Sequence, residues 1–126
     1  MKIDRRAVVA GAARGALIAG LAIVAAQAVR SLTNADANLG LYLVLLGGLV
    51  AGGQRAGRRR PESPLTHGAL AGLGAYVVVL VVVTAVRLAV GRPLADPVSF
   101  VFNGLMAASA GILGGYLAQR NPPRQA

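Results

Sequence analysis

Apolar and charged positions separate into long blocks along this chain. Uncharged apolar stretches cover residues 16–29, 39–53, 68–86 and 98–118, and the segments between them hold nearly all of the charges. A hydrocarbon core of about 30 Å needs roughly 20 helical residues to cross it. The third and fourth stretches meet or nearly meet that length. The pattern therefore predicts an all-α membrane protein.

The first two stretches are shorter and need flanking residues to cross. The first is long enough if it begins near Ala7 and carries Arg14 one or two turns inside its start, where a guanidinium can reach the headgroups. The second must begin among residues 35–38, thin the bilayer locally, or dip in and return. We expect four transmembrane helices in a single transmembrane domain, over about 7–29, 37–54, 66–87 and 98–119.

The loop charges predict the orientation, because positively charged segments stay on the cytoplasmic side. If all four stretches cross, one side holds nine cations and the other holds three, Arg30, Arg87 and Arg92. The nine are Lys2, Arg5, Arg6, Arg55, Arg58, Arg59, Arg60, Arg120 and Arg124. Both termini are therefore expected in the cytoplasm. A re-entrant second segment would break this alternation, so the charges also favour a second span.

The N-terminus offers an alternative. Its two consecutive arginines followed by apolar residues resemble a twin-arginine export signal, and residues 26–28 resemble a small-residue cleavage site. Cleavage would leave three spans. Arg14 interrupts the apolar run and no soluble domain follows for export, so we favour retention of the first span.

The two halves of the chain resemble each other. Residues 14–21 match 67–73, residues 28–30 match 85–87, and residues 48–52 match 111–115, in the same order. This predicts two copies of a helical hairpin in the same orientation, a parallel repeat.

Glycines four residues apart occur in every apolar segment, and this spacing places both on one helix face, where a neighbouring backbone can approach closely. In the predicted topology all the pairs fall in the cytoplasmic half. The third segment continues outward as a run of valines and leucine over residues 77–83. We expect a bundle that is tight inside and splayed outside. The helix-packing residues are Gly11, Gly15, Gly48, Gly52, Gly68, Gly72, Gly111 and Gly115.

Composition limits the partners, cofactors and catalytic roles that we expect for this chain. The net charge is +9, but the basic residues flank apolar spans, so we expect no nucleic-acid partner. The chain has no cysteine and one histidine, His67, so we expect no metal site and no cofactor. Ser109 with His67 suggests an intramembrane serine hydrolase, but four short helices offer little to surround a nucleophile. We expect no catalytic residue and no enzyme.

Transport is an alternative that the polar residues weaken. The acids, Asp4, Asp36, Glu62 and Asp96, lie in loops or tails, whereas proton-coupled carriers need a membrane acid, as in small multidrug-resistance exporters. The length and span number resemble those of fluoride channels, but their late phenylalanine-threonine-serine stretch is missing. Asn103 is the most interior polar residue, and it either bonds a neighbouring helix or lines a pore.

The second loop places Arg55, Arg58, Arg59 and Arg60 at the predicted cytoplasmic surface. Their minimal role is to fix the topology. Each arginine near an anionic leaflet also contributes about 1 kcal/mol, so the four are candidates for contact with anionic lipid headgroups.

The centre of the chain carries a resemblance. Residues 47–58 read GGLVAGGQRAGR, and after a short basic loop residues 67–73 read HGALAGL. This resembles an uncharacterised bacterial family of small four-helix integral membrane proteins, with a Gly-rich second helix, an arginine loop and a His-Gly start to the third helix. The resemblance implies the four-helix topology and no activity.

We therefore expect a multi-pass protein of the bacterial inner membrane. Arginine far outnumbers lysine, which with the abundance of Ala and Gly is typical of GC-rich bacterial genomes. The expected role is a structural or accessory subunit, or a self-assembling bundle, with the lipid bilayer and either further copies or a larger membrane complex as partners. A small oligomeric channel or carrier is the alternative, and a holin-like pore former a further one.

Overall fold

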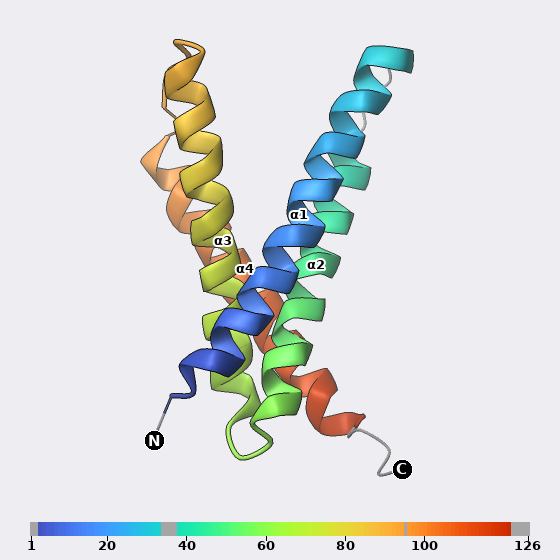
Figure 1. Ribbon diagram of the computed structural model, residues 1–126, viewed down its shortest axis with the longest axis vertical. Helices are drawn as coiled ribbons and strands as arrows, with labels where there is room; N and C mark the ends of the chain where they lie inside the picture. The colour runs from blue at the N-terminus through green and yellow to red at the C-terminus, as the bar shows by residue number, and fades with distance from the viewer. Residues whose placement is uncertain (1–2, 34–37, 95, 122–126) are drawn as a thin grey trace.

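The computed structural model describes residues 3–33, 38–94 and 96–121, and four helices account for its regular secondary structure (Figure 1). Each helix continues past the end of its predicted span, the second one through Arg58 and Arg59. The fold is all-α, as predicted. The helices are α1 (Arg5–Thr33), α2 (Asn38–Arg59), α3 (Pro64–Ala89) and α4 (Pro97–Arg120).

Local chemistry fixes the described helix ends. Asp4 caps α1, since its Oδ1 accepts hydrogen bonds from the backbone N–H groups of Arg6 at 2.9 Å and Ala7 at 3.3 Å. Both α3 and α4 begin with a proline, whose missing N–H has no intrahelical partner to lose there. After α3 the chain turns at Gly91, which has a φ of 66°, a left-handed conformation that suits glycine.

The four helices run alternately up and down, and both ends of the described chain lie at the same end of the molecule (Figure 1). Helices α1 and α3 therefore run in the same direction. Among the described residues, every pair of helices packs together except α1 with α4. The α1–α2 pair and the α3–α4 pair meet at the end that holds the α2–α3 loop and diverge toward the other, so the molecule is V-shaped.

Small residues form the core, and they lie where the two hairpins meet. We call this part the closed half, residues 5–19, 48–59, 64–75 and 107–120, and the diverging remainder the open half. Among the described residues, the hydrophobic core consists of alanines, of which all but Ala22 lie in the closed half: Ala7, Ala12, Ala19, Ala22, Ala56, Ala71, Ala75, Ala107, Ala110 and Ala118. The backbones approach closely because so little side chain separates them. The expected shape, tight at one end and splayed at the other, is confirmed, whereas which end is cytoplasmic stays a prediction.

The two hairpins cross in the same register. In the first, Gly15 lies against Gly48 and Gly11 against Gly52. In the second, Gly68 lies against Gly111, and Gly115 against Pro64. The sequence match aligns residue 14 with 67 and residue 48 with 111. In this alignment, the contact of Gly15 with Gly48 corresponds to that of Gly68 with Gly111, and the contact of Gly11 with Gly52 corresponds to that of Pro64 with Gly115. With the common direction of α1 and α3, this correspondence supports a parallel repeat.

Three helices are long and apolar enough to cross a membrane: α1 over Arg5–Ala25, α3 and α4. The 26 residues of α3 extend about 39 Å at 1.5 Å per residue, more than a hydrocarbon core. Three arginines crowd the last two turns of α2. A fourth span over α2, and the orientation in the membrane, stay predictions.

Candidate functional site: the closed half of the bundle

All eight glycines named from the sequence are buried in the closed half, and each lies against another helix. A Cβ added to Gly11 would lie 2.6 Å from the carbonyl oxygen of Gly52, and one added to Gly52 would lie equally close to that of Gly11. A Cβ on Gly68 or Gly72 would meet the backbone of α4 in the same way. The structure thus brings these pairs together across helices at main-chain distance.

Three further glycines also lie close against another helix, and pattern reasoning missed them. Gly53 lies against Gly111, Gly57 against Gly115, and Gly114 against the backbone of α2. Adjacent helical residues differ by about 100°, so a glycine doublet offers backbone to two neighbouring helices. Gly52 faces α1 while Gly53 faces α4. The doublets at 52–53 and 114–115 were the signal that could have found Gly53 and Gly114, whereas Gly57 belongs to no doublet.

A polar group of four residues closes the base of the bundle; we call Asp4, Arg60, Ser63 and His67 the N-terminal cluster. Arg60 Nε donates to Asp4 Oδ2 over 2.7 Å, and the backbone N–H of Asp4 donates to His67 Nε2 over 3.0 Å. His67 Nδ1 lies 2.9 Å from the carbonyl oxygen of Ser63 and 3.0 Å from its Oγ. The cluster joins the start of α1 to the α2–α3 loop and the first turn of α3.

The hydrogen bonds of the cluster determine the tautomer of His67 and shift the pKa values of Asp4 and Arg60. A backbone N–H only donates, so His67 Nε2 accepts and the ring proton of the neutral imidazole is on Nδ1, which donates to Ser63. The hydrogen bond from Arg60 holds the pKa of the Asp4 carboxyl below its ordinary value, and the same bond raises the pKa of Arg60. His67 is 1% exposed, and it is the largest fully buried side chain among the described residues.

Sequence reasoning did not anticipate this cluster. It weighed His67 with Ser109 as a hydrolase pair, but the structure does not join them. The Ser109 hydroxyl donates to the carbonyl of Leu105 in its own helix, over 2.9 Å, and faces outward. Within residues 3–33, 38–94 and 96–121, no group of three His, Asp or Glu residues could hold a metal ion.

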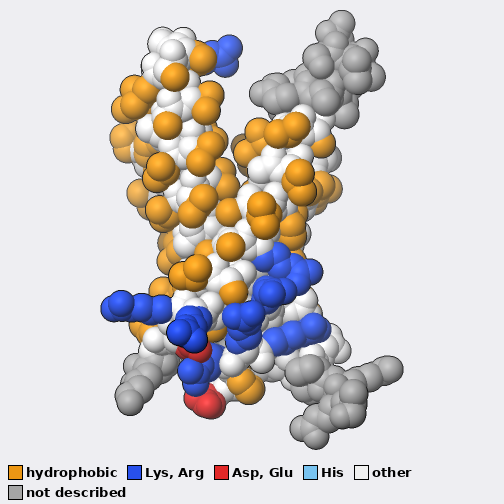
Figure 2. All heavy atoms as spheres, viewed as in Figure 1, with side chains coloured by type: hydrophobic (Ala, Val, Ile, Leu, Met, Phe, Trp, Pro, Cys, Tyr) orange, Lys and Arg blue, Asp and Glu red, His pale blue; other side chains and the backbone are white. Residues whose placement is uncertain are grey.

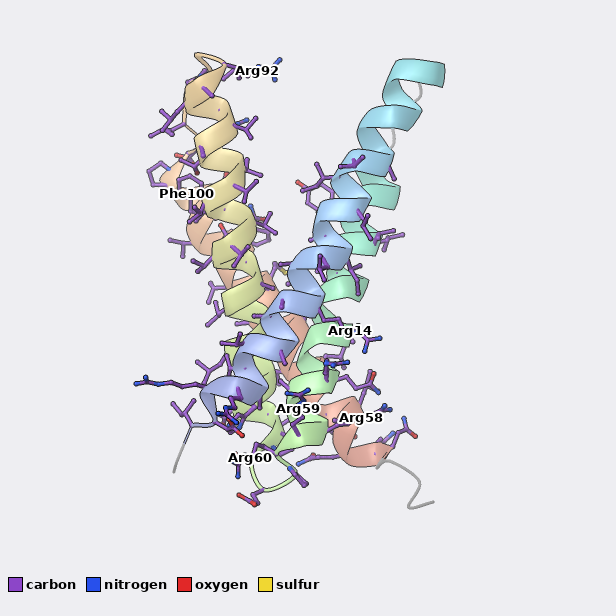
Figure 3. All side chains as sticks on the ribbon, in the orientation of Figure 1. Arg14, Arg58, Arg59, Arg60, Arg92 and Phe100 are labelled. Atoms are coloured by element: carbon purple, nitrogen blue, oxygen red, sulfur yellow. The ribbon has the colours of Figure 1, made fainter. Side chains whose placement is uncertain are left out.

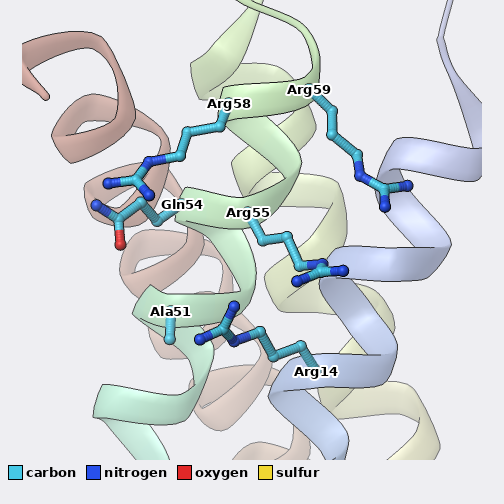
Figure 4. Close-up of a pocket in the computed structure, with 6 residues that line it drawn as sticks. All are labelled: Arg14, Ala51, Gln54, Arg55, Arg58 and Arg59. Atoms are coloured by element: carbon cyan, nitrogen blue, oxygen red, sulfur yellow. The ribbon is translucent and has the colours of Figure 1, made fainter. Parts of the chain in front are cut away.

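The sequence places four arginines in the second loop, but in the structure Arg55, Arg58 and Arg59 belong to α2 and only Arg60 lies in the loop, because the helix continues to Arg59. These arginines divide between two environments. Arg55, Arg58 and Arg59 line a cavity of about 360 Å³ that is also lined by Arg14 of α1 and by Ala51 and Gln54 of α2 (Figure 4). We call it the arginine cavity. Arg60, which the sequence placed with the other three, pairs with Asp4 instead. The fourth arginine of the cavity is Arg14, which reaches it because α1 and α2 cross in antiparallel directions.

No protein-family model, curated protein or solved structure matches this chain. The site must therefore be interpreted from its own geometry. Charge is strongly polarised along the molecule: basic side chains gather around the closed half, and Arg92 extends from the far end (Figures 2 and 3). Lys2 and Arg124, which the sequence assigns to the same side as the loop arginines, lie outside the described residues.

Asn103 lies in the open half, on α4. It is exposed and precedes Gly114 by eleven residues, three helical turns, so both lie on the helix face that contacts α2 at Gly114. At the level of Asn103 the two hairpins have diverged (Figure 1). Here α3 and α4 stay together, since the Tyr76 hydroxyl donates to the carbonyl of Phe100 over 2.9 Å.

Proposed function

We propose that this protein is a multi-pass protein of the bacterial cytoplasmic membrane that functions by assembling with further copies of itself. Helix α2 crosses as a fourth span, and the closed half with both termini faces the cytoplasm. The distribution of charge supports this orientation, because the arginines of the closed half would stay on the cytoplasmic side. The role is structural and not enzymatic.

The observation that carries the proposal is the exposed amide of Asn103 on the face of the open half that continues the bundle core. An amide without a partner is costly in hydrocarbon, and interhelical hydrogen bonds between polar side chains stabilise helix association in membranes. A second copy presents the same amide, so two Asn103 side chains can pair across a twofold axis. Met106, 41% exposed and one turn along the same face of α4, supplies apolar contact.

The test is the mass of the intact complex released from lipid nanodiscs. We expect a defined homo-oligomer for the native chain and a shift toward monomer for Asn103→Leu. Ser109→Ala is the matched control, because its hydroxyl is already bonded within α4 and its loss should leave the oligomer intact. A native chain that is monomeric would contradict the proposal. A stable complex with a different protein would make the chain an accessory subunit instead.

A small oligomeric channel or carrier is the second candidate, and the same residue favours it. In an assembly, Asn103 side chains of several copies could surround a polar path instead of pairing. Ion flux from vesicles that contain the purified oligomer distinguishes the two roles. Flux that Asn103→Leu abolishes while the oligomer persists would favour the channel, and an intact oligomer without flux would favour the structural role.

A further inference from the structure

Four guanidinium groups line one cavity on the α1–α2 side of the closed half. Arg14 reaches it from α1, and Arg55, Arg58 and Arg59 reach it from the last turns of α2 (Figure 4). Ala51 provides a small wall, and Gln54 adds an amide that can donate or accept. The volume of about 360 Å³ is enough for a group much larger than a water molecule.

The cavity lacks an internal counter-charge. Its lining contains four arginines and no acid. Among the described residues the acids are Asp4, Glu62 and Asp96, and Asp4 forms its ion pair with Arg60, outside the lining. All four arginine side chains are exposed, and with no acid in the lining their positive charges attract an anion. An arrangement of this kind is stabilised when an anion enters.

The repeat offers an internal comparison. The residue of the second hairpin that corresponds to Arg14 is His67, which is buried and already bonded to Asp4 and Ser63. The residue that corresponds to Arg55 is Ala118, also buried. Both hairpins run in the same direction and share the same crossing register, yet only the first carries this group of arginines. Membrane orientation alone does not require Arg14, which lies inside a helix and not in a loop.

The depth of the arginines matches a lipid headgroup. Arg58 and Arg59 end α2, Arg55 is one turn inside, and Arg14 is nine residues from the start of α1, about 14 Å along its axis. The guanidinium groups are thus staggered from the predicted membrane surface inward. A membrane phospholipid presents its phosphate at this boundary, with the acyl chains continuing into the hydrocarbon. The planar fork of arginine binds phosphate oxygens in pairs.

We propose that the arginine cavity binds the phosphate of an anionic phospholipid headgroup, with Arg14 and Arg55 as the inner pair and Arg58 and Arg59 as the outer pair. Arg60, committed to Asp4, takes no part. This inference rests on the membrane location in the proposed function but not on self-assembly. Phosphate is the shared chemistry of a lipid headgroup and of free inorganic phosphate, and we commit to the lipid as its source.

The experiment is native mass spectrometry of the protein released from nanodiscs of phosphatidylcholine and phosphatidylglycerol in equal amounts. The native chain should retain phosphatidylglycerol preferentially, and Arg14→Gln with Arg55→Gln should lower that preference about tenfold. Arg5→Gln with Arg6→Gln is the matched control, because it removes the same charge from the same end of the molecule, outside the cavity. The control should lower the preference clearly less than the cavity pair does, because Arg5 and Arg6 lie outside the lining and contribute only through their general surface charge.

A second variant keeps every charge. Ala51→Leu places a larger side chain into the cavity wall, so it should also lower the retention of phosphatidylglycerol if the cavity itself is the site. Circular dichroism and the unfolding temperature identify any variant that misfolds, and Ala51→Leu then serves in place of the arginine pair. Equal preference in the native chain, both cavity variants and the control would overturn the proposal.

A separate arm distinguishes the source of the phosphate. Inorganic phosphate is titrated against the protein in neutral detergent. Binding of inorganic phosphate without any preference for phosphatidylglycerol would overturn the lipid as the ligand. The same mass spectra report the number of protein copies independently of the bound lipid, so failure of self-assembly and failure of this proposal are distinguishable.

Discussion

The backbone N–H of Asp4 donates a hydrogen bond to the imidazole of His67, 63 residues later in the chain, over 3.0 Å. This contact fixes the start of α1 against the first turn of α3, at the end of the molecule where the helices are closest. Because His67 is buried, no water replaces it readily as an acceptor. Asp4 and the start of α1 are therefore part of the bundle.

Removing this acceptor should loosen the N-terminus. His67→Leu leaves the Asp4 N–H without a partner, which we expect to cost about 1–3 kcal/mol of unfolding free energy. Hydrogen exchange at the Asp4 amide should accelerate, and unfolding in detergent gives the free energy. His67→Gln is the control, since its amide oxygen can accept the same bond and should restore part of the protection. Unchanged exchange in His67→Leu would show that the contact contributes nothing.

The Asp4–Arg60 pair predicts a dependence on acidity. The pKa of Asp4 is lowered from 3.8, chiefly by the hydrogen bond from Arg60. A depressed carboxyl pKa contributes stability that is fully present above the ordinary value and is lost as the pH falls through the lower, folded value. The N-terminal cluster should therefore hold above about pH 4 and weaken only in stronger acid.

Carbon-13 NMR of the Asp4 carboxyl in detergent micelles measures this directly. We expect a midpoint below 3.8 in the native chain and a rise toward 3.8 in Arg60→Gln. Arg59→Gln removes an adjacent charge that does not bond Asp4, so it should leave the midpoint nearly unchanged. If the two variants gave the same midpoint, the pair would not be the cause of the shift.

Substitution by alanine should change the unfolding free energy in opposite directions at two glycines of α2. A Cβ on Gly53 would meet the backbone of Gly111, with its Cα at 2.9 Å, whereas a Cβ on Gly47 has no neighbouring atom within 4 Å. We expect Gly53→Ala to destabilise the fold by about 1–3 kcal/mol, since backbones must separate. Gly47→Ala should be neutral or stabilise by up to about 1 kcal/mol, because alanine favours the helix.

Unfolding free energies in the same detergent compare the two variants. The second hairpin has the same kind of close contact, so Gly68→Ile should disrupt the fold or its assembly, because Gly68 faces the backbone of α4. Equal effects of alanine at 47 and 53 would mean that close backbone contact does not hold the closed half together.

Single cysteines test the topology, and the native chain contains none to interfere. Cysteine at Glu62 or Asn121 should react with a membrane-impermeant maleimide only from the cytoplasmic side, and cysteine at Leu94 only from the other. Position 36, outside the described residues, decides the second span: it should react from the side of Leu94. Reaction of position 36 from the cytoplasmic side would show that the topology with a full second span is wrong.

Much of the fold was predictable because it depends on spacing within single helices. The four-residue glycine periodicity predicts which face of each helix accepts a close neighbour, and the valine run at 77–83 predicts where the helices of the bundle separate. The spacing within one helix does not predict which neighbouring helix each face contacts. Gly52 and Gly53 look alike in sequence, yet one meets α1 and the other α4.

The N-terminal cluster and the arginine cavity depend on that missing information. Asp4 and Arg60 are 56 residues apart, and Arg14 reaches the loop arginines only because α1 crosses α2 with Gly11 against Gly52. Such contacts depend on how each helix is rotated about its axis and on the residues at which two helices cross. No pattern within a single helix predicts either of these. Arg60 was therefore grouped with Arg55, Arg58 and Arg59 by its position in the chain, although its nearest partner is Asp4.

The alanine and glycine core limits how this molecule can change by mutation. In the part of the chain that the structure describes, the hydrophobic core consists of alanines, so substitution offers almost no way to hollow it, the usual route by which proteins lose stability. Nearly every change there adds atoms where two backbones already touch. Random variation at this end of the protein should thus be tolerated mainly in one direction, from alanine to glycine, while the exposed valines and leucines of the open half exchange freely.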